Sequence, residues 1–173
     1  KMYMGNIKLV LENEGVFLSD KTYYNLENEL TIRTNIKSKS YNHISFLIDC
    51  KNNKLLSYAL NIYFKTESFP FSIHSEINVI NKIYKKLLSK PVKKTKKKLI
   101  ILRVSKIGVI GNSKPCLGCA NFIYNNMDNI NIINILYSDI ENKLESLKKD
   151  ELILDNFNLS SGAMRRDRSK KKN

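Results

Sequence analysis

The sequence has no tryptophan, only three cysteines and only three alanines, and it contains no long uninterrupted apolar segment. No apolar run approaches the roughly 20 residues that a membrane-spanning helix needs, so we expect no membrane partner. Three cysteines are too few, and odd in number, for a disulfide framework. The N-terminus also lacks the apolar core and cleavage pattern of a secretory signal. We therefore expect an intracellular, reducing location, either cytoplasmic or nuclear, with a virion as a further option.

Positive charge is what the sequence has in excess. Its 173 residues suit one domain with a sizeable core, and they carry a formal net charge of +14. Residues 90–98 contribute +6 and residues 165–173 contribute +5, which leaves only +3 for the rest. Lysine is common throughout this composition, but three of the five arginines lie at 165–168, and arginine suits phosphate.

These two clusters predict contact with a polyanion through a basic loop and a basic tail. Neither cluster is interleaved with aromatic residues, so sequence-specific base recognition is not implied. Nuclear-import or packing signals are the alternative interpretation. The residues expected to contact nucleic acid are Lys93, Lys94, Lys96, Lys97, Lys98, Arg165, Arg166 and Arg168.

The pattern of apolar residues becomes regular from position 43. Two β-rich runs at 43–50 and 55–64, separated by a polar turn, predict an antiparallel hairpin. Apolar residues at helical spacing over 77–88, ended by Pro91, predict an amphipathic helix. The almost wholly apolar run at 99–104 predicts a buried strand, which we expect to continue through 107–110.

A second helix, a strand and a third helix are expected after this strand. Pro115 is expected to open a helix over 116–127, because proline is tolerated at a first helical position. Residues 130–137 predict a strand, and residues 139–149 predict a surface helix with two leucines facing inward. The predicted order is β-β-α-β-α-β-α, an α/β domain in which helices cover a sheet.

Two short motifs carry the chemistry, HSE at 74–76 and PCLGC at 115–119, and each lies at the start of a predicted helix. Two cysteines three residues apart on a first helical turn direct both sulfurs one way, and the helix N-terminus favours the thiolate that metals bind. Adding His74 gives a Cys2His zinc site, whose fourth tetrahedral position is left for water, as in catalytic zinc sites. Glu76 is then placed to take that water's proton.

A structural zinc site is the alternative for these residues, and it would need a fourth protein ligand. Cys50 and His43 are the remaining cysteine and histidine of the chain. Both lie in the first predicted strand, where Cys50 is expected to be a buried small apolar residue and His43 an ordinary residue at the strand edge.

The two motifs resemble the signature of the zinc-dependent cytidine/deoxycytidylate deaminase superfamily, H-x-E followed later by P-C-x-x-C. The resemblance extends to the element order over 43–149. It implies a three-layer cytidine deaminase-like fold, a mixed β-sheet covered by helices. The chain then divides into an N-terminal extension of unclear structure (1–40), a deaminase-like zinc domain (41–155) and a basic, flexible tail (156–173). No convincing fifth strand follows residue 149.

The resemblance also implies a role for each motif residue. His74, Cys116 and Cys119 bind Zn²⁺, which activates a water. Glu76 moves the proton of that water while the amino-bearing carbon of the base is attacked and ammonia leaves. Asn61 is similar to an asparagine that contacts the substrate in this family, and Phe71 is available for stacking on the base. The residues expected to contact substrate are Asn61, Phe71, Ser75, Ser113 and Pro115.

The resulting hypothesis is a hydrolytic deaminase of a cytosine-type base in a nucleotide or a single-stranded nucleic acid. The alternative is a non-catalytic, deaminase-fold structural or nucleic-acid-binding component of a virion or nucleoprotein particle. Retention of Glu76 favours the enzyme, because a scaffold needs no proton shuttle, whereas the basic tail and the missing fifth strand favour the scaffold. A free-nucleoside enzyme would leave the clustered charge unused. A homo-oligomer or larger particle is compatible with each hypothesis.

Overall fold

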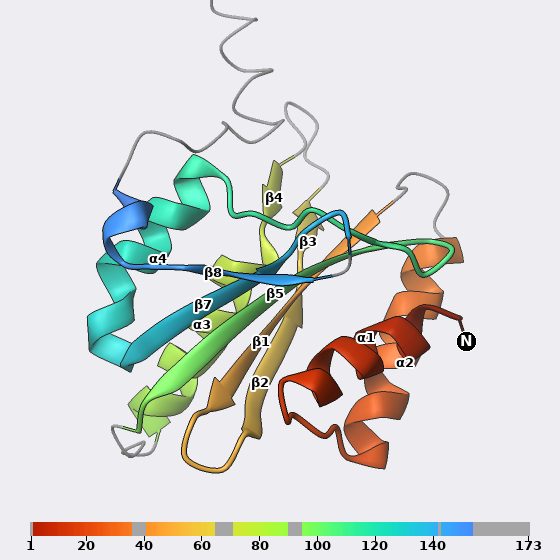
Figure 1. Cartoon of the computed structure of the whole chain (residues 1–173), viewed down its shortest axis with the longest axis horizontal. Helices are drawn as coiled ribbons and strands as arrows, with labels where there is room; N and C mark the ends of the chain where they lie inside the picture. The colour runs from red at the N-terminus through yellow and green to blue at the C-terminus, as the bar shows by residue number, and fades with distance from the viewer. Residues whose placement is uncertain (1, 36–40, 65–70, 90–94, 142, 154–173) are drawn as a thin grey trace, which may run out of the picture.

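The computed structural model describes residues 2–35, 41–64, 71–89, 95–141 and 143–153 (Figure 1). Its elements, in chain order, are α1 (Met2–Asn13), α2 (Asp20–Asn35), β1 (Tyr41–Asp49), β2 (Lys54–Leu60), β3 (Ile62–Phe64), β4 (Phe71–Ile73), α3 (Ser75–Ser89), β5 (Lys97–Ser105), β6 (Ile110–Gly111), α4 (Leu117–Ile130), β7 (Ile132–Ser138), β8 (Leu144–Leu147) and the 3₁₀ turn η1 (Asp150–Leu152). Within these described ranges, every helix is too short or too polar to cross a bilayer.

A mixed sheet forms the centre of the molecule, with the strand order β2-β1-β5-β7-β8 and with β6 paired to the end of β5. β1 pairs antiparallel with both β2 and β5, and β7 pairs antiparallel with β8. β5 and β7 are parallel, and α4 connects them, as a parallel pair requires a crossover. β3 and β4 form a separate two-stranded sheet.

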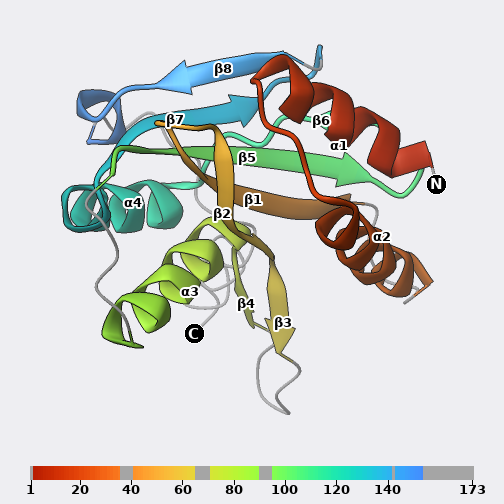
Figure 2. The ribbon, with the colours of Figure 1, turned by 90° about the horizontal axis from the view of Figure 1, so that it is seen from below.

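Helices pack on both faces of this sheet. Leu99 and Ile101 of β5 lie in the core shared with α3 and α4, whereas Ile100 and Leu102 lie in the core shared with α1 and α2. Figure 2 shows α1 and α3 on opposite sides of β1 and β5. Because both faces are covered, β5 needs apolar residues at successive positions, which explains the unbroken run in the sequence. The predicted α/β class with a helix-covered mixed sheet is confirmed.

Several predicted elements are present near their expected positions. The hairpin of β1 and β2 is confirmed, and α3 and β7 cover most of the predicted 77–88 and 130–137 segments. The start of α4 differs, because its first helical residue is Leu117 and Cys116 is the N-cap. Pro115 therefore lies before the helix, and the prediction that it occupies the first helical position is wrong.

The predicted helix over 139–149 is wrong, because this segment forms a turn and then strand β8. Asp139 Oδ1 accepts the backbone N–H groups of Glu141 and Lys143, each at 2.8 Å, and this turn reverses the chain. β8 then pairs with β7 and buries Leu147. Without β8, β7 would present an unpaired edge, so pairing outweighs the helical spacing of the leucines. β8 is a strand that the sequence did not predict, and it lies before residue 149.

The expected continuation of the β5 strand through 107–110 is also wrong. The chain turns after Ser105, whose carbonyl accepts the N–H of Gly108 at 3.0 Å. Gly108 has φ = +85°, a backbone conformation that glycine adopts without the steric cost of a Cβ. β6 then returns antiparallel to β5.

The N-terminal segment, whose structure the sequence left unclear, supplies two helices to one face of the sheet. Met4, Ile7 and Leu11 of α1 are fully buried in the same core as Leu26 of α2. The side chain of Asn6 donates to the carbonyl of Gly108 at 2.8 Å, which joins α1 to the turn after β5. The two helices therefore share a core with the sheet.

Candidate metal centre

His74 lies between β4 and α3, at the point where the small sheet ends. Ile73 of β4 pairs with Ile62 of β3, and this pairing fixes the direction in which the chain enters the helix. The His74 carbonyl accepts the N–H of Asn78 at 3.0 Å, the first hydrogen bond of α3. His74 is therefore the residue that immediately precedes the first helical turn.

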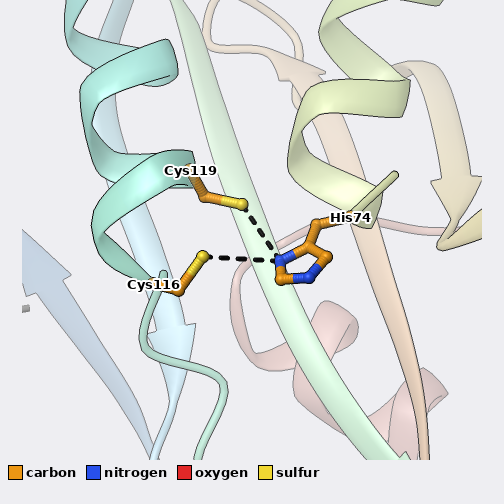
Figure 3. A group of neighbouring side chains, drawn as sticks. All are labelled: His74, Cys116 and Cys119. Carbon is orange, nitrogen blue, oxygen red and sulfur yellow. Dashed lines mark hydrogen bonds between the residues drawn. The ribbon is translucent and has the colours of Figure 1, made fainter. Parts of the chain in front are cut away.

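Both cysteines lie at the N-terminus of α4. Cys116 is the N-cap, with extended backbone angles, and its carbonyl accepts the N–H of Ala120 at 2.9 Å. Cys119 lies in the first turn and is buried. Residues three apart are neighbours on a helix surface, so both sulfurs lie on the same side of the helix start, as the spacing predicts. Figure 3 shows both thiols directed toward the ring of His74.

The three side chains are close enough to hold one ion. His74 Nδ1 lies 3.2 Å from Cys119 Sγ and 3.6 Å from Cys116 Sγ (Figure 3). All three atoms lie within 4.8 Å of one another. Zinc bonds of about 2.3 Å to sulfur and about 2.1 Å to nitrogen place those ligand atoms about 3.6 Å apart in a tetrahedral site. The donor atoms and their spacing therefore fit zinc.

Cys50 and His43, the two candidates for a fourth ligand, are not part of this group in the described part of the chain. Cys50 follows the other end of β1, where its N–H donates to the Lys96 carbonyl at 2.9 Å. The ring of His43 stacks against the ring of His74 with centroids 6.5 Å apart, outside the ligand group. A tetrahedral ion held by three side chains keeps one position for a small molecule, which is the arrangement of catalytic zinc sites.

The two thiols and the imidazole differ in their readiness to lose a proton. A hydrogen bond from Cys119, reinforced by interaction with His74, lowers the pKa of Cys116 to about 4. The hydrogen bond to Cys116, followed by burial, raises the pKa of Cys119. The hydrogen bond to Cys116 raises the pKa of His74 against the effect of burial. The lowered pKa of Cys116 favours its thiolate, the form that binds metals.

Glu76 lies in the first turn of α3 and is almost fully buried, with 2% of its surface exposed. Burial raises the pKa of its carboxyl, because the charged form loses its hydration. Ser75 donates to Glu76 Oε2 at 3.2 Å, and the Ser75 hydroxyl also contacts the hydroxyl of Ser45 at 2.7 Å. This chain ties the carboxyl to β1. Glu76 follows His74 by two residues, so it lies at the same helix start as this ligand.

Ser113, expected to contact substrate, has its hydroxyl engaged by the sheet. The hydroxyl donates to the Ile101 carbonyl at 2.6 Å and accepts the backbone N–H of Ser138 at 2.7 Å. The Ser138 hydroxyl lies 2.9 Å from it and bonds the Gly111 carbonyl at 2.7 Å. These bonds join the loop before Cys116 to β5 and β7, so Ser113 positions the cysteines relative to the sheet.

The remaining expected substrate residues have different surroundings. Asn61 is buried between β2 and β3, and its side-chain oxygen accepts the backbone N–H of His43 at 3.4 Å. Pro115 is buried directly before Cys116. Phe71 begins β4, three residues before the metal-binding group, but its side chain lies outside the described part of the structure.

Three of the eight basic residues expected to contact nucleic acid lie in the described part of the structure, and they differ in exposure. Lys96 is exposed, whereas Lys97 is 3% exposed and its ammonium donates to the Thr95 carbonyl at 2.8 Å. Lys98 donates to the Glu14 carbonyl at 3.0 Å and pairs with its carboxylate. These bonds turn Lys97 and Lys98 toward the protein and away from an external polyanion. The other five expected contacts, Lys93, Lys94, Arg165, Arg166 and Arg168, lie outside the described residues.

The sequence indicated His43 only as a possible fourth ligand, and it did not single out Arg103. They are opposite one another in the pairing of β1 with β5. His43 was expected to be an ordinary strand-edge residue, whereas its ring stacks on His74. The signal for Arg103 was present, because one arginine interrupts the apolar run at 99–104, and a charged residue in a buried strand needs a reason.

His43 gives the site a measurable pH dependence. Burial, followed by the positive charge of Arg103, lowers the pKa of His43 from 6.5 to about 4. Between these two values the unfolded chain binds a proton and the folded chain does not, so stability falls as the pH falls from 6.5 to 4. When the pH is lowered, we expect the unfolding free energy to fall less in the His43→Gln variant than in the unmodified chain. The difference between the two losses is expected to reach up to about 3 kcal/mol. Urea unfolding at pH 7 and pH 4.5 measures the difference, and equal losses would contradict it.

Comparison with known proteins found no protein-family model and no curated protein that matches the sequence. The site is therefore defined by the residues of this chain. His74, Cys116 and Cys119 form a group able to hold a metal on a mixed α/β sheet. The ion and the reaction are proposed from these features.

Proposed function

We propose that this protein is a zinc-dependent hydrolytic deaminase that acts on a cytosine-type base in a nucleotide or a nucleic acid. The observation that carries the proposal is a buried carboxyl, Glu76, two residues after His74, which is one of three ligands gathered at the starts of two neighbouring helices. A structural zinc site needs four ligands and no carboxyl of this kind. The combination of open ligand group and proton-transfer residue is typical of zinc hydrolases.

The arrangement of elements supports the same proposal. The helix that follows His74 and the helix that contains Cys119 pack on one face of the sheet, where the Tyr84 hydroxyl of α3 donates to Asn126 Oδ1 of α4 at 2.9 Å. The main path of the six-stranded sheet has the order β2-β1-β5-β7-β8, and β6 pairs with β5. In a deaminase-like fold, H-x-E and P-C-x-x-C also lie at the starts of two helices on one face of the sheet. We propose that fold for residues 41–153.

The chemistry proposed for the site is a hydrolysis in which water replaces an amino group. Zinc held by His74, Cys116 and Cys119 supplies a nucleophile at neutral pH, because it lowers the pKa of water to about 7. Glu76 accepts the first proton of the water and delivers it to the ring nitrogen, which keeps it. It then moves the second proton, from the new hydroxyl group, to the departing amino group. The C–N bond breaks, a C=O bond forms, and one ammonia leaves for each water consumed. The raised pKa of Glu76 suits both transfers, because it brings the carboxyl closer to working pH.

The other residues of the site are proposed to hold the base and its attached sugar. Asn61 lies on the β1 side of His74, because its side chain accepts the N–H of His43. Pro115 lies on the cysteine side. We assign Phe71 to stacking on the base. We assign Lys96, together with Lys93, Lys94, Arg165, Arg166 and Arg168, to contact with phosphates of a nucleic acid partner. Ser75 and Ser113 serve as positioning residues, because their hydroxyls bond to neighbouring side chains and carbonyls.

Ammonia release tests the proposal directly. The full chain, loaded with one equivalent of zinc, is incubated with cytidine, cytidine 5′-monophosphate and a short single-stranded oligonucleotide that contains one cytosine. We expect ammonia and the corresponding uracil product from at least one of them, detected by mass spectrometry. A zinc-loaded, folded chain that releases no ammonia from any of these substrates would contradict the proposal, and it would favour the non-catalytic binding component instead.

A further inference from the structure

Arg103 is a charged side chain near the C-terminal end of the core strand β5, and the described structure leaves it without an anion. Its Nε is buried and has no hydrogen-bond partner among the described residues. The ion pairs in the described part of the chain all use lysine. The guanidinium instead lies over the ring of Tyr41, with Cζ 4.1 Å from the ring centroid. This contact orients the guanidinium but supplies no acceptor for its N–H groups.

Arg103 is connected to the metal-binding group through His43. In the sheet, Arg103 lies opposite His43 of β1, and the ring of His43 stacks against His74. On its other side, Arg103 lies opposite Gly111 of β6. A Cβ at Gly111 would lie 3.7 Å from Arg103 Cδ and 3.6 Å from the Tyr41 ring, which are ordinary contact distances, so Gly111 borders both side chains.

A buried donor with no partner is costly, and natural proteins rarely keep one without a use. The backbone of Arg103 is held by the Ser138 hydroxyl at 3.4 Å, so the strand position is fixed independently of the side chain. An apolar residue would fill a strand position in this core without leaving a donor unpaired. The guanidinium is therefore suited to an acceptor that arrives with a ligand.

We propose that Arg103 is a specificity-determining residue that binds a phosphate group of the substrate while the base lies at the metal centre. This inference rests on the proposed deaminase function and extends it, since it selects phosphorylated substrates over free nucleosides. The planar fork of arginine forms two parallel hydrogen bonds with phosphate oxygens, and Tyr41 holds its plane. The phosphate belongs either to a mononucleotide or to the backbone of a single-stranded nucleic acid.

Binding measurements test this inference without relying on turnover. Glu76→Gln serves as the parent, so that substrates are not consumed, and calorimetry gives the affinities of cytidine, cytidine 5′-monophosphate, inorganic phosphate and a short single-stranded oligonucleotide with one cytosine. We expect the parent to bind the monophosphate or the oligonucleotide at least tenfold more tightly than cytidine. Adding Arg103→Met is expected to remove that preference and to weaken binding of inorganic phosphate by a similar factor.

Two further variants keep the result interpretable. Arg103→Lys retains the charge without the fork, so we expect a partial loss, and it replaces Arg103→Met if that variant does not fold by circular dichroism. Lys85→Met removes one exposed charge of α3 and is expected to leave all affinities unchanged. If the Arg103 variants lose affinity only for the monophosphate, the phosphate that Arg103 binds belongs to a mononucleotide. If they lose affinity only for the oligonucleotide, it belongs to the backbone of a nucleic acid.

The two proposals fail in different ways. Absence of ammonia release from the unmodified chain would contradict the deaminase function, but it would leave an Arg103-dependent affinity for inorganic phosphate in place. Equal phosphate and nucleotide affinities in the parent and the Arg103 variants would overturn the inference about Arg103 even in an active enzyme. Failure of the parent to bind inorganic phosphate, the monophosphate and the oligonucleotide would overturn it as well.

Discussion

Replacing Glu76 with glutamine is expected to reduce deamination by roughly 10²–10⁴-fold or more while zinc remains bound. Glutamine has nearly the same shape and can still accept the hydrogen bond from Ser75, so the buried pocket keeps its packing. An amide cannot take the proton from water or return it to the departing amino group. The ammonia release rate and the zinc content of the same preparation, determined by elemental analysis, measure the two effects separately.

The control for this prediction is Glu29→Gln, which makes the same substitution at an exposed position of α2 on the opposite face of the sheet. We expect its turnover to match that of the unmodified chain. Undiminished turnover in Glu76→Gln would contradict the assignment of Glu76 to proton transfer. Loss of zinc in that variant would instead mean that the carboxyl supports the ligands.

Replacing Cys119 with serine is expected to abolish stable zinc binding. Cys119 is almost fully buried and lies 3.2 Å from His74 Nδ1, so a serine hydroxyl would be a weaker ligand on a shorter side chain. A ligand that binds only the folded chain stabilises it by about 4 kcal/mol when its free concentration is 1,000 times the dissociation constant. We therefore expect zinc to raise the melting temperature of the unmodified chain and to leave that of Cys119→Ser almost unchanged.

Cys50→Ser is the matched control for this experiment, because Cys50 follows β1 at the end opposite to the metal-binding group. Zinc content after dialysis and melting curves with and without chelator are measured for all three chains. We expect about one zinc per chain in the unmodified protein and in Cys50→Ser. Retention of the same zinc content by Cys119→Ser would contradict the ligand assignment.

The metal-binding group could be predicted from the sequence because each of its parts is a local signal. A histidine at one helix start and two cysteines three residues apart at another need only the two helices to lie side by side. The apolar run at 99–104 correctly indicated strand β5, on which both of these helices pack. His74, Cys116 and Cys119 are therefore together as predicted.

The features that the sequence did not reveal depend on contacts between distant segments. Residues 144–147 have the leucine spacing of a helix, and only the open edge of β7 makes them a strand. The helices of the N-terminal segment pack through buried residues, but their periodicity is diluted by polar neighbours. Arg103 and His43 become neighbours of the site through the register of β1 with β5, which no local pattern encodes.

Because the ligands are far apart along the chain, binding of a metal would depend on the tertiary structure. His74 and Cys116 are 42 residues apart, and the strand β5 lies between them in sequence. Neither helix start alone offers more than two of the three ligands, so tight binding requires that β5 has already paired in the sheet and that α3 and α4 have docked. Loop closure of this length costs entropy before any ligand contact forms. Zinc occupancy during refolding would therefore follow the assembly of the whole sheet and lag behind formation of the helices.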